Sequence, residues 1–298
     1  MTETAIGGGT PAWLQLLVYQ QHLVLLLTLF GGMLLFMLIE RPRPGETATQ
    51  ALPLSHWLNN IFLAALNYTA GLWLVMTLGD AAWLAGLRPG WSLFDWLHPV
   101  LALPLLWCVL EAVDYWLHRL YHQVPLLWRI HAVHHMDRHL DVTTSHRHHT
   151  LEVVLFSALS LPLFLLLGAP AVLLVLLTVL RTLLVLFNHA SITLPAGLER
   201  WLRYVVVTPA FHHVHHLATP YCTNSNYGTT VPWFDYLFGT ARSLPVPALA
   251  RAQVGLDYLD RPGDERLDRI LLLPLRWPRT RQRAAPLVTP AAPGPGQQ

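Results

Sequence analysis

Histidine is the residue type in this sequence whose spacing points most directly to chemistry. Fourteen of the 17 histidines lie between residues 118 and 216. An imidazole nitrogen binds zinc, copper, iron or nickel, so this enrichment indicates a metal site. Three groups recur at short, regular spacing: His118 and His122, then His131, His134 and His135, and finally His212, His215 and His216.

The spacing within each group is that of one face of a helix. Residues three or four positions apart in a helix lie side by side on its surface. The first group has the pattern His-x-x-x-His, and the other two share the pattern His-x-x-His-His. We therefore expect each group to present its imidazoles together from one helix. Eight such ligands are more than one metal ion needs, which favours two metal ions in one shared site.

Other interpretations of the histidines stay open. Single histidines such as His22, His56 and His98 are typical of a surface or an interface. A metal-buffering loop can also be rich in histidine, but such loops are usually irregular and do not repeat a helical face. Two further ligands are expected near the fourth apolar run, namely His189 and one histidine of segment 146–149, for which we assign His149 and keep His146 and His148 as alternatives.

Long apolar runs surround the histidine groups. The chain is 53% hydrophobic and 12% charged, whereas soluble domains carry about 25% charged residues. Four runs reach or exceed the roughly 20 residues that a membrane-spanning helix needs. The fourth is too long for one span and contains Pro162 and Gly168-Ala169-Pro170, so we expect a helical hairpin there. The runs cover residues 13–39, 57–78, 97–117 and 153–187.

The expected fold class is all-α. We expect a multi-pass membrane protein in which the helices that carry the histidine groups lie on the cytoplasmic side and cap the spans. We expect N-terminal spans in residues 1–96, a catalytic domain in residues 97–245 and a C-terminal extension with a disordered tail in residues 246–298. Arg41 and Arg43 follow the first run. The positive-inside rule then puts the N-terminus outside and the histidine groups in the cytoplasm, at the inner membrane if the chain is bacterial.

Other classes of protein find little support in the sequence. The net charge of +2 does not suggest a nucleic-acid partner. The two cysteines, Cys108 and Cys222, form neither a disulfide framework nor a zinc pattern. The sequence also has no dinucleotide fingerprint and no haem or iron–sulfur cysteine motif, so electrons for redox chemistry would have to come from a separate protein.

Between about Leu105 and Thr240 the sequence resembles the fatty acid hydroxylase superfamily, which includes sterol desaturases and sterol methyl oxidases. The resemblance rests on the three histidine groups with their flanking residues and on two motifs that follow them. The motifs are Asp114-Tyr-Trp-Leu-His118-Arg-Leu-Tyr-His122, His131-Ala-Val-His134-His135, Thr208-Pro-Ala-Phe-His212-His-Val-His215-His216, Asn224-Ser-Asn226-Tyr-Gly228 and Trp233-Phe-Asp235-Tyr-Leu-Phe-Gly239-Thr240.

The resemblance implies two iron ions bound almost wholly by histidine, with zinc as an alternative metal. It implies an O2-dependent enzyme that hydroxylates or desaturates a C–H bond of a lipid taken from the bilayer. The electrons would come from a separate donor protein. The substrate could be a fatty acyl chain, a sterol-like ring or a carotenoid. The expected metal ligands are the eight histidines of the three groups together with His149 and His189.

Carboxylates near the histidines are candidates for a supporting role. Asp114 lies one turn before His118. Its carboxylate could orient a ligand imidazole by a hydrogen bond without binding the metal itself. It could equally accept a hydrogen bond at a helix end. Glu152 and Asp235 are weaker candidates of the same kind.

Two positions depart from the family pattern. The family usually has Arg-x-His-Pro-x-Glu where this chain has Arg147-His-His149-Thr150-Leu-Glu152. The missing proline leaves the local turn, and the choice of ligand within it, open. The family also often has arginine at the position of His213, which we expect to neighbour the site rather than to bind metal.

Two functions from other classes compete with the lipid oxygenase. A membrane di-zinc hydrolase would use similar histidines, but such enzymes usually keep a carboxylate ligand and a Glu base. A metal-binding or transport protein would place polar residues inside the spans, whereas the histidine groups here sit at span ends.

For a lipid oxygenase we expect a mostly apolar channel lined by residues such as Trp107, Leu110 and Leu184.

Overall fold

The computed structural model of the chain describes residues 12–40, 52–84, 93–261 and 263–277. Within these ranges the chain is helical and has no β-strand apart from one isolated bridge between Leu217 and Val254. Five helices are long and apolar enough to cross a bilayer, which confirms the predicted all-α, multi-pass fold. They are Gln21–Ile39, Leu54–Leu78, Val100–Gln123, Thr150–Leu167 and Ala171–His189.

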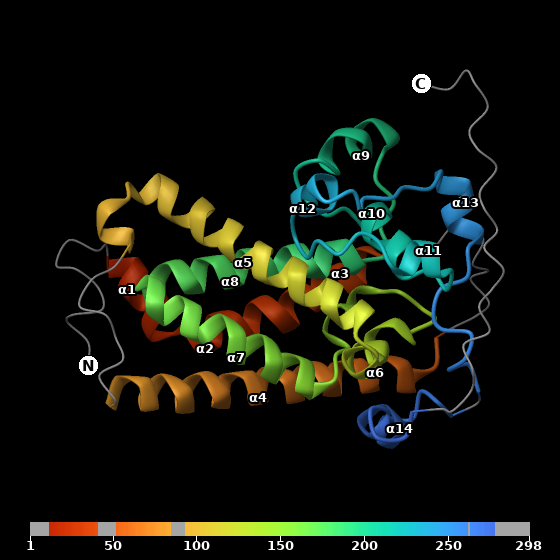
Figure 1. The fold of residues 1–298 in the computed structure, drawn as a ribbon, viewed down its shortest axis with the longest axis horizontal. Coiled ribbons are helices and arrows are strands. Elements are labelled where there is room, and N and C mark those ends of the chain that lie inside the picture. Colours follow the sequence, from red (N-terminus) through yellow and green to blue (C-terminus); the bar gives the residue numbers. More distant parts are fainter. Residues whose placement is uncertain (1–11, 41–51, 85–92, 262, 278–298) are drawn as a thin grey trace.

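The spans alternate in direction along the chain (Figure 1). The ends of α3, α5 and α8 and the starts of α4 and α7 all lie at one end of the bundle, which we call the site end. Helix α1 (Ala12–Tyr19) precedes the first span, which combines α2 (Gln21–Leu26), a π-turn (Leu27–Gly31) and α3 (Gly32–Ile39). The others are α4 (Leu54–Leu84), α5 (Pro99–Gln123), α7 (Thr150–Leu167) and α8 (Ala171–His189).

The predicted hairpin is formed by α7 and α8. Gly168 ends α7 with a φ of 62°, a left-handed conformation that glycine adopts without steric cost. Pro170 then precedes the first residue of α8. Pro162 does not break the run, because α7 continues through it to Leu167. The hairpin thereby returns the chain to the site end.

The first span is fastened to the site end by one carboxylate. Glu40, just after α3, accepts hydrogen bonds from the backbone N–H of Val142 (2.7 Å) and of Ser191 (2.8 Å). Gly32 lets α3 approach α8 closely, since a Cβ at this position would lie 2.8 Å from Leu186 Cδ1. A larger residue there would require the side chain of Leu186 to shift.

Short helices cover the site end (Figure 1). One hydrophobic cluster there joins distant parts of the chain, including Leu63 of α4, Val133 of α6 and Ile270 of α14. The division into three domains stays a prediction. The short elements are α6 (Pro125–His135), a 3-10 turn (Val142–His146), α9 (Ala196–Leu202), α10 (Pro209–His215), α11 (Pro220–Thr223), α12 (Trp233–Leu237), α13 (Val246–Arg251) and α14 (Leu267–Leu272). A further 3-10 turn, Leu93–Trp96, precedes α5 at the other end of the bundle.

Some sequence-based expectations lie outside the described residues. They concern Arg41 and Arg43 and the tail from residue 278 onward. The cytoplasmic orientation therefore stays a prediction.

Both sides of the hairpin should face the same compartment. Reporter fusions that end after His135 and after His216 should read the same side of the membrane, because α7 and α8 cross it twice. A fusion that ends at Ala169, in the turn between them, should read the opposite side. Opposite readings for the first two fusions would contradict the fold.

Candidate metal centre

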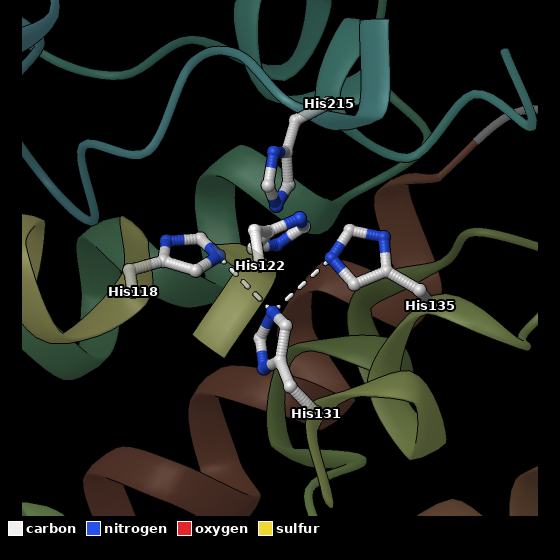
Figure 2. Close-up of side chains that lie close together, drawn as sticks. All are labelled: His118, His122, His131, His135 and His215. Atoms are coloured by element: carbon white, nitrogen blue, oxygen red, sulfur yellow. Dashed lines mark hydrogen bonds between the residues drawn. The ribbon is translucent and has the colours of Figure 1, made fainter. Parts of the chain in front are cut away.

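Five imidazoles converge in a first cluster (Figure 2). One nitrogen from each lies within 4.8 Å of those from the other four. The Nε2 atom of His131 lies 3.1 Å from that of His118 and 3.1 Å from that of His135. The cluster draws on three helices: His118 and His122 from α5, His131 and His135 from α6, and His215 from α10.

Four further imidazoles form a second cluster beside the first. The Nε2 atom of His189, at the end of α8, lies 3.3 Å from that of His134 and 3.0 Å from that of His212. His216 Nε2 lies 3.1 Å from His212 Nε2. The two clusters adjoin, because the rings of His135 and His216 stack with centroids 4.7 Å apart.

The backbone orients several of these rings. His118 Nδ1 lies 2.8 Å from the carbonyl oxygen of Tyr227, and His215 Nδ1 lies 2.6 Å from that of Ser225. His189 Nδ1 lies 2.9 Å from the carbonyl of Val185. A carbonyl oxygen can only accept, so Nδ1 carries the proton and the lone pair of Nε2 points into the cluster. This tautomer is the one that binds metal through Nε2.

The converging lone pairs fit metal ions. The buried nitrogens of His122 and the Nε2 of His215 have no hydrogen-bond partner, and a buried polar atom without a partner is costly. Two nitrogens bound to one ion at about 2.0–2.1 Å would lie roughly 3.0–3.4 Å apart. The observed Nε2 separations of 3.0 to 3.3 Å agree with that value. Each cluster can therefore hold one metal ion.

The segment Ser225–Gly228 supplies two of these carbonyls and is itself tightly held. Asn226 has a φ of 52°, a left-handed conformation that asparagine tolerates better than most residues. Its side-chain amide donates to the carbonyl of Phe211 at 2.7 Å. Asp235 accepts from the backbone N–H of Tyr227 (2.8 Å) and of Gly228 (2.7 Å). The two motifs after the last histidine group thus position the rings of that group and of the first.

Glu152 links the clusters to the start of α7. Its Oε1 lies 3.0 Å from His131 Nδ1 and 3.0 Å from His148 Nδ1. The ring of His148 also stacks on His134, with centroids 4.3 Å apart and planes at 13°. Burial lowers the pKa of His148, but the charge of Glu152, the hydrogen bond to Glu152 and a hydrogen bond to the backbone of Ser145 together outweigh it, and the net shift is upward. From the sequence, Glu152 was only a weaker candidate for a supporting role. In the structure its carboxylate orients His131, a candidate ligand.

The structure does not place His149 with the clusters. Its Nε2 lies 3.1 Å from the carbonyl of Leu271, and its Nδ1 accepts from the N–H of Leu151, which makes it the N-cap of α7. His148 lies beside the clusters instead. The remaining assigned ligands, His118, His122, His131, His134, His135, His189, His212, His215 and His216, all fall in one cluster or the other.

Asp114 belongs to a buried group of charges between the spans. It pairs with Arg181 of α8, which also pairs with Glu111. Glu111 in turn accepts from the N–H of Thr230 at 2.9 Å. Ionisable residues within spans commonly mark functional regions, and this group joins α5 and α8 to the segment before α12. The predicted role of Asp114 in orienting an imidazole stays a prediction.

A polar stripe on α4 holds the segment that leads into α7. Asn60 accepts from Arg147 Nη1 at 2.8 Å, and Asn67 donates to the carbonyl of His148 at 2.8 Å. His56 belongs to the same stripe because the spacing puts all three on one helix face. Other contacts of the stripe are with Asp137, Asp141, Thr143 and Thr150. Sequence analysis missed this stripe, although its helical spacing within an apolar run was visible.

A cavity of about 290 Å³ opens from the clusters between the spans. Its apolar walls come from Leu117 of α5, Val153 and Phe156 of α7 and Val185 of α8. The predicted lining residues were wrong. Trp107 and Leu110 belong instead to the packed cluster between α5 and its neighbours, and Leu184 is not among the lining residues. Polar residues also line the cavity: Asp114, Ser145, His146, His148, Glu152, Arg181, Asn188 and Thr229, beside ligand candidates His118, His131, His134, His189 and His212.

Burial favours the neutral, metal-binding form of the histidines outside the spans. It lowers the pKa of five of them well below 6.5, and the neighbouring imidazoles lower it further. These five are His134, His135, His212, His215 and His216. His213 is buried too, but its Nε2 lies 3.3 Å from the carbonyl of His189 and outside both clusters.

Residues 103–240 match the family described as fatty acid hydroxylase. These residues, just under half of the chain, are similar to that family. The match covers all nine clustered histidines and both motifs that orient them. The resemblance seen in the sequence is confirmed.

Three relatives illustrate the range of the family. Ornithine lipid hydroxylase OlsE of Rhizobium tropici is 33% identical over 135 residues, which are 45% of this chain and 40% of that protein. Alkylglycerol monooxygenase of Xenopus tropicalis is 30% identical over 155 residues, 51% of this chain and 33% of that protein. Methylsterol monooxygenase 2-2 of Arabidopsis thaliana is 28% identical over 155 residues, 52% and 58% of the two chains. The chain thus covers less than two thirds of each relative. No solved structure matches it.

The different placements of His148 and His149 predict different variants. His148→Ala should weaken metal binding roughly 10- to 100-fold, as expected when a residue beside the ligands is lost. His149→Ala should keep the metal and lose the helix cap and the hydrogen bond to Leu271, each at a cost of about 1 kcal/mol in unfolding free energy. Metal content after dialysis and thermal unfolding would measure both. Loss of metal from His149→Ala alone would reverse the assignment.

Stability should fall with pH below about 6.5. The unfolded chain takes up protons on its histidines near that pH, whereas the folded chain resists protonation of the five histidines with lowered pKa. Each contributes a slope of up to about 1.4 kcal/mol per pH unit. Unfolding temperatures between pH 8 and pH 5 should show the decline, and His215→Gln should make it shallower. A flat profile would mean that these histidines are not buried in the neutral form.

Proposed function

We propose that this protein is a membrane-bound, O2-dependent di-iron oxygenase that hydroxylates a C–H bond of a lipid. The observation that carries the proposal is the pair of adjoining imidazole clusters at the inner end of a cavity walled by membrane spans. The names of the relatives, which are lipid and sterol hydroxylases or monooxygenases, support it.

The residues that would hold the metals are the nine clustered histidines. The first cluster offers five nitrogens and the second offers four. Imidazole nitrogen suits iron as well as zinc. Two irons bound in this way would supply the activation of O2 and the attack on an unactivated C–H bond.

The protein's own residues would orient the ligands and shield the site. Hydrogen bonds donated by Nδ1 fix four of the rings. The acceptors are the carbonyls of Ser225, Tyr227 and Val185 and the carboxylate of Glu152. The clustered histidines of α6 and α10 are almost fully buried, so bulk water is kept from their outer sides. The open approach to the clusters is the cavity between α5, α7 and α8.

A lipid substrate fits this approach. The apolar walls of the cavity belong to α5, α7 and α8, all of which are candidate spans. A lipid could enter from the bilayer without exposing its apolar part to water, which would cost about 0.8 kcal/mol per CH₂ group. The polar residues in the cavity favour a lipid with a polar group near the reacting carbon over a pure hydrocarbon.

The orientation in the membrane and an electron donor complete the proposal. We place the site end on the cytoplasmic side because of the arginine distribution. Electrons would come from a separate donor protein, and the arginine-rich segments beyond residue 200 could receive an acidic one.

The decisive experiment is a labelling test in cells. Cells with and without the gene would be grown under ¹⁸O₂ and their lipids profiled by mass spectrometry. We expect a lipid that gains one ¹⁸O atom only when the gene is present. His134→Ala and His215→Ala should abolish this product and lower the iron content of the purified protein, since each removes a ligand.

His22→Ala is the matched control and should retain product and iron, because His22 lies in the first span away from both clusters. An unlabelled product with two fewer hydrogens would indicate desaturation, and an unlabelled product of bond cleavage by water would indicate hydrolysis. Bound metal without any changed lipid would favour a metal-binding or transport protein.

A further inference from the structure

The site end carries an unusual exposed surface on α9 and α12. Trp201 is 67% exposed and Leu237 is 71% exposed. Large exposed apolar patches on a protein usually mark an interaction site. We call this surface the aromatic face and define it by Leu198, Trp201, Tyr204, Trp233, Leu237 and Phe238, all of which are exposed.

The two short helices form one unit. The rings of Tyr204 and Tyr236 stack with centroids 5.0 Å apart. Trp233 Nε1 donates to the carbonyl of Tyr204 at 3.1 Å. The carboxylates of these helices do not interrupt the face, because Asp235 is buried and Glu199 accepts a hydrogen bond from Thr208.

The aromatic face continues the outer surface of a span. Phe238 packs on Trp116 of α5 with ring centroids 4.9 Å apart, and both rings are exposed on their outer side. Trp116 lies on the same outward side of α5 as Leu105, Leu101 and Leu120, which are exposed as expected of residues that face lipid. Figure 1 shows α9 and α12 beside the site-end halves of α5 and α8.

The depth of Trp116 agrees with a membrane boundary. A hydrocarbon layer of about 30 Å corresponds to about 20 helical residues at 1.5 Å each. Counted from Val100, the first residue of this span, that layer ends near Leu120. Trp116 and its neighbour Phe238 therefore lie where tryptophan and other aromatic residues gather in membrane proteins.

Arginines flank the face in the manner of an interfacial surface. The Arg200 guanidinium lies 5.2 Å from the ring centre of Trp201, and that of Arg119 lies 5.5 Å from Trp116. Long basic side chains at a membrane surface commonly cover apolar area and keep their charge near the headgroups.

We propose that the aromatic face is seated in the interfacial layer of the bilayer, so that α9 and α12 lie on the membrane beside the spans. The occupant of this surface is lipid, because the face is continuous with the lipid-facing side of α5. The seat would anchor α10, which directly follows α9 and carries the last histidine group. The proposal does not depend on the reaction that the clusters perform.

Nitroxide labels on single cysteines would test the seat in the full-length protein, reconstituted in phosphatidylcholine and phosphatidylglycerol vesicles. Native Cys108, exposed on α5, provides the reference within the bilayer. Trp201→Cys and Leu237→Cys would be made in a Cys108→Ala background, with buried Cys222 left in place. Ala248→Cys on α13, exposed at the far edge of the site end, provides the aqueous reference.

The measured quantity is the ratio of collision rates with oxygen, which concentrates in lipid, to those with a water-soluble nickel complex. We expect this ratio at positions 201 and 237 to be several-fold higher than at position 248 and closer to that at Cys108. A ratio equal to that at 248 would overturn the proposal. Protection from both reagents at 201 and 237 would also overturn it, since it would mean that protein covers the face.

Discussion

Nine imidazoles share one buried region of this protein. In four of them, His118, His131, His189 and His215, a hydrogen bond from Nδ1 leaves an unprotonated Nε2 that faces the clusters. Neutral lone pairs about 3 Å apart repel unless something positive lies between them. The arrangement is stable only if cations occupy the clusters or if other contacts hold the rings in place. Much of the site end can be understood as the set of contacts that meets this requirement.

Those contacts come from segments that lie far apart in the sequence. The carbonyls of Ser225 and Tyr227 face two rings only because Asn226 adopts a left-handed conformation and Asp235 holds the following N–H groups. Glu152 reaches His131 because α7 starts immediately after His149. A metal site of this kind therefore needs rigid backbone around it as much as it needs histidines.

The sequence predicted the spans, the hairpin and ten histidine ligands, nine of which the structure brings together, because these follow from local periodicity. His149 was chosen over His148 because helical spacing cannot say which of two neighbours caps a helix and which faces inward. The role of Glu152 depends on a contact between residues 21 positions apart. The cavity walls depend on the relative rotation of α5, α7 and α8, which no single segment determines. Trp107 and Leu110 lie on the same face of α5 as the lining residues Asp114 and Leu117, but nearer the start of the helix, where this face packs against other side chains instead of the cavity.

The polar stripe on α4 has a consequence for how the protein is made. Asn60 and Asn67 find their partners in residues that lie 77 to 87 positions later in the chain. At about 5–20 residues per second, a ribosome needs roughly 4–17 s to supply them. During that interval α4 must reside in or near the membrane with its amide groups unpaired. Insertion machinery or water at the translocation channel would have to shelter this helix until Arg147 and its neighbours emerge.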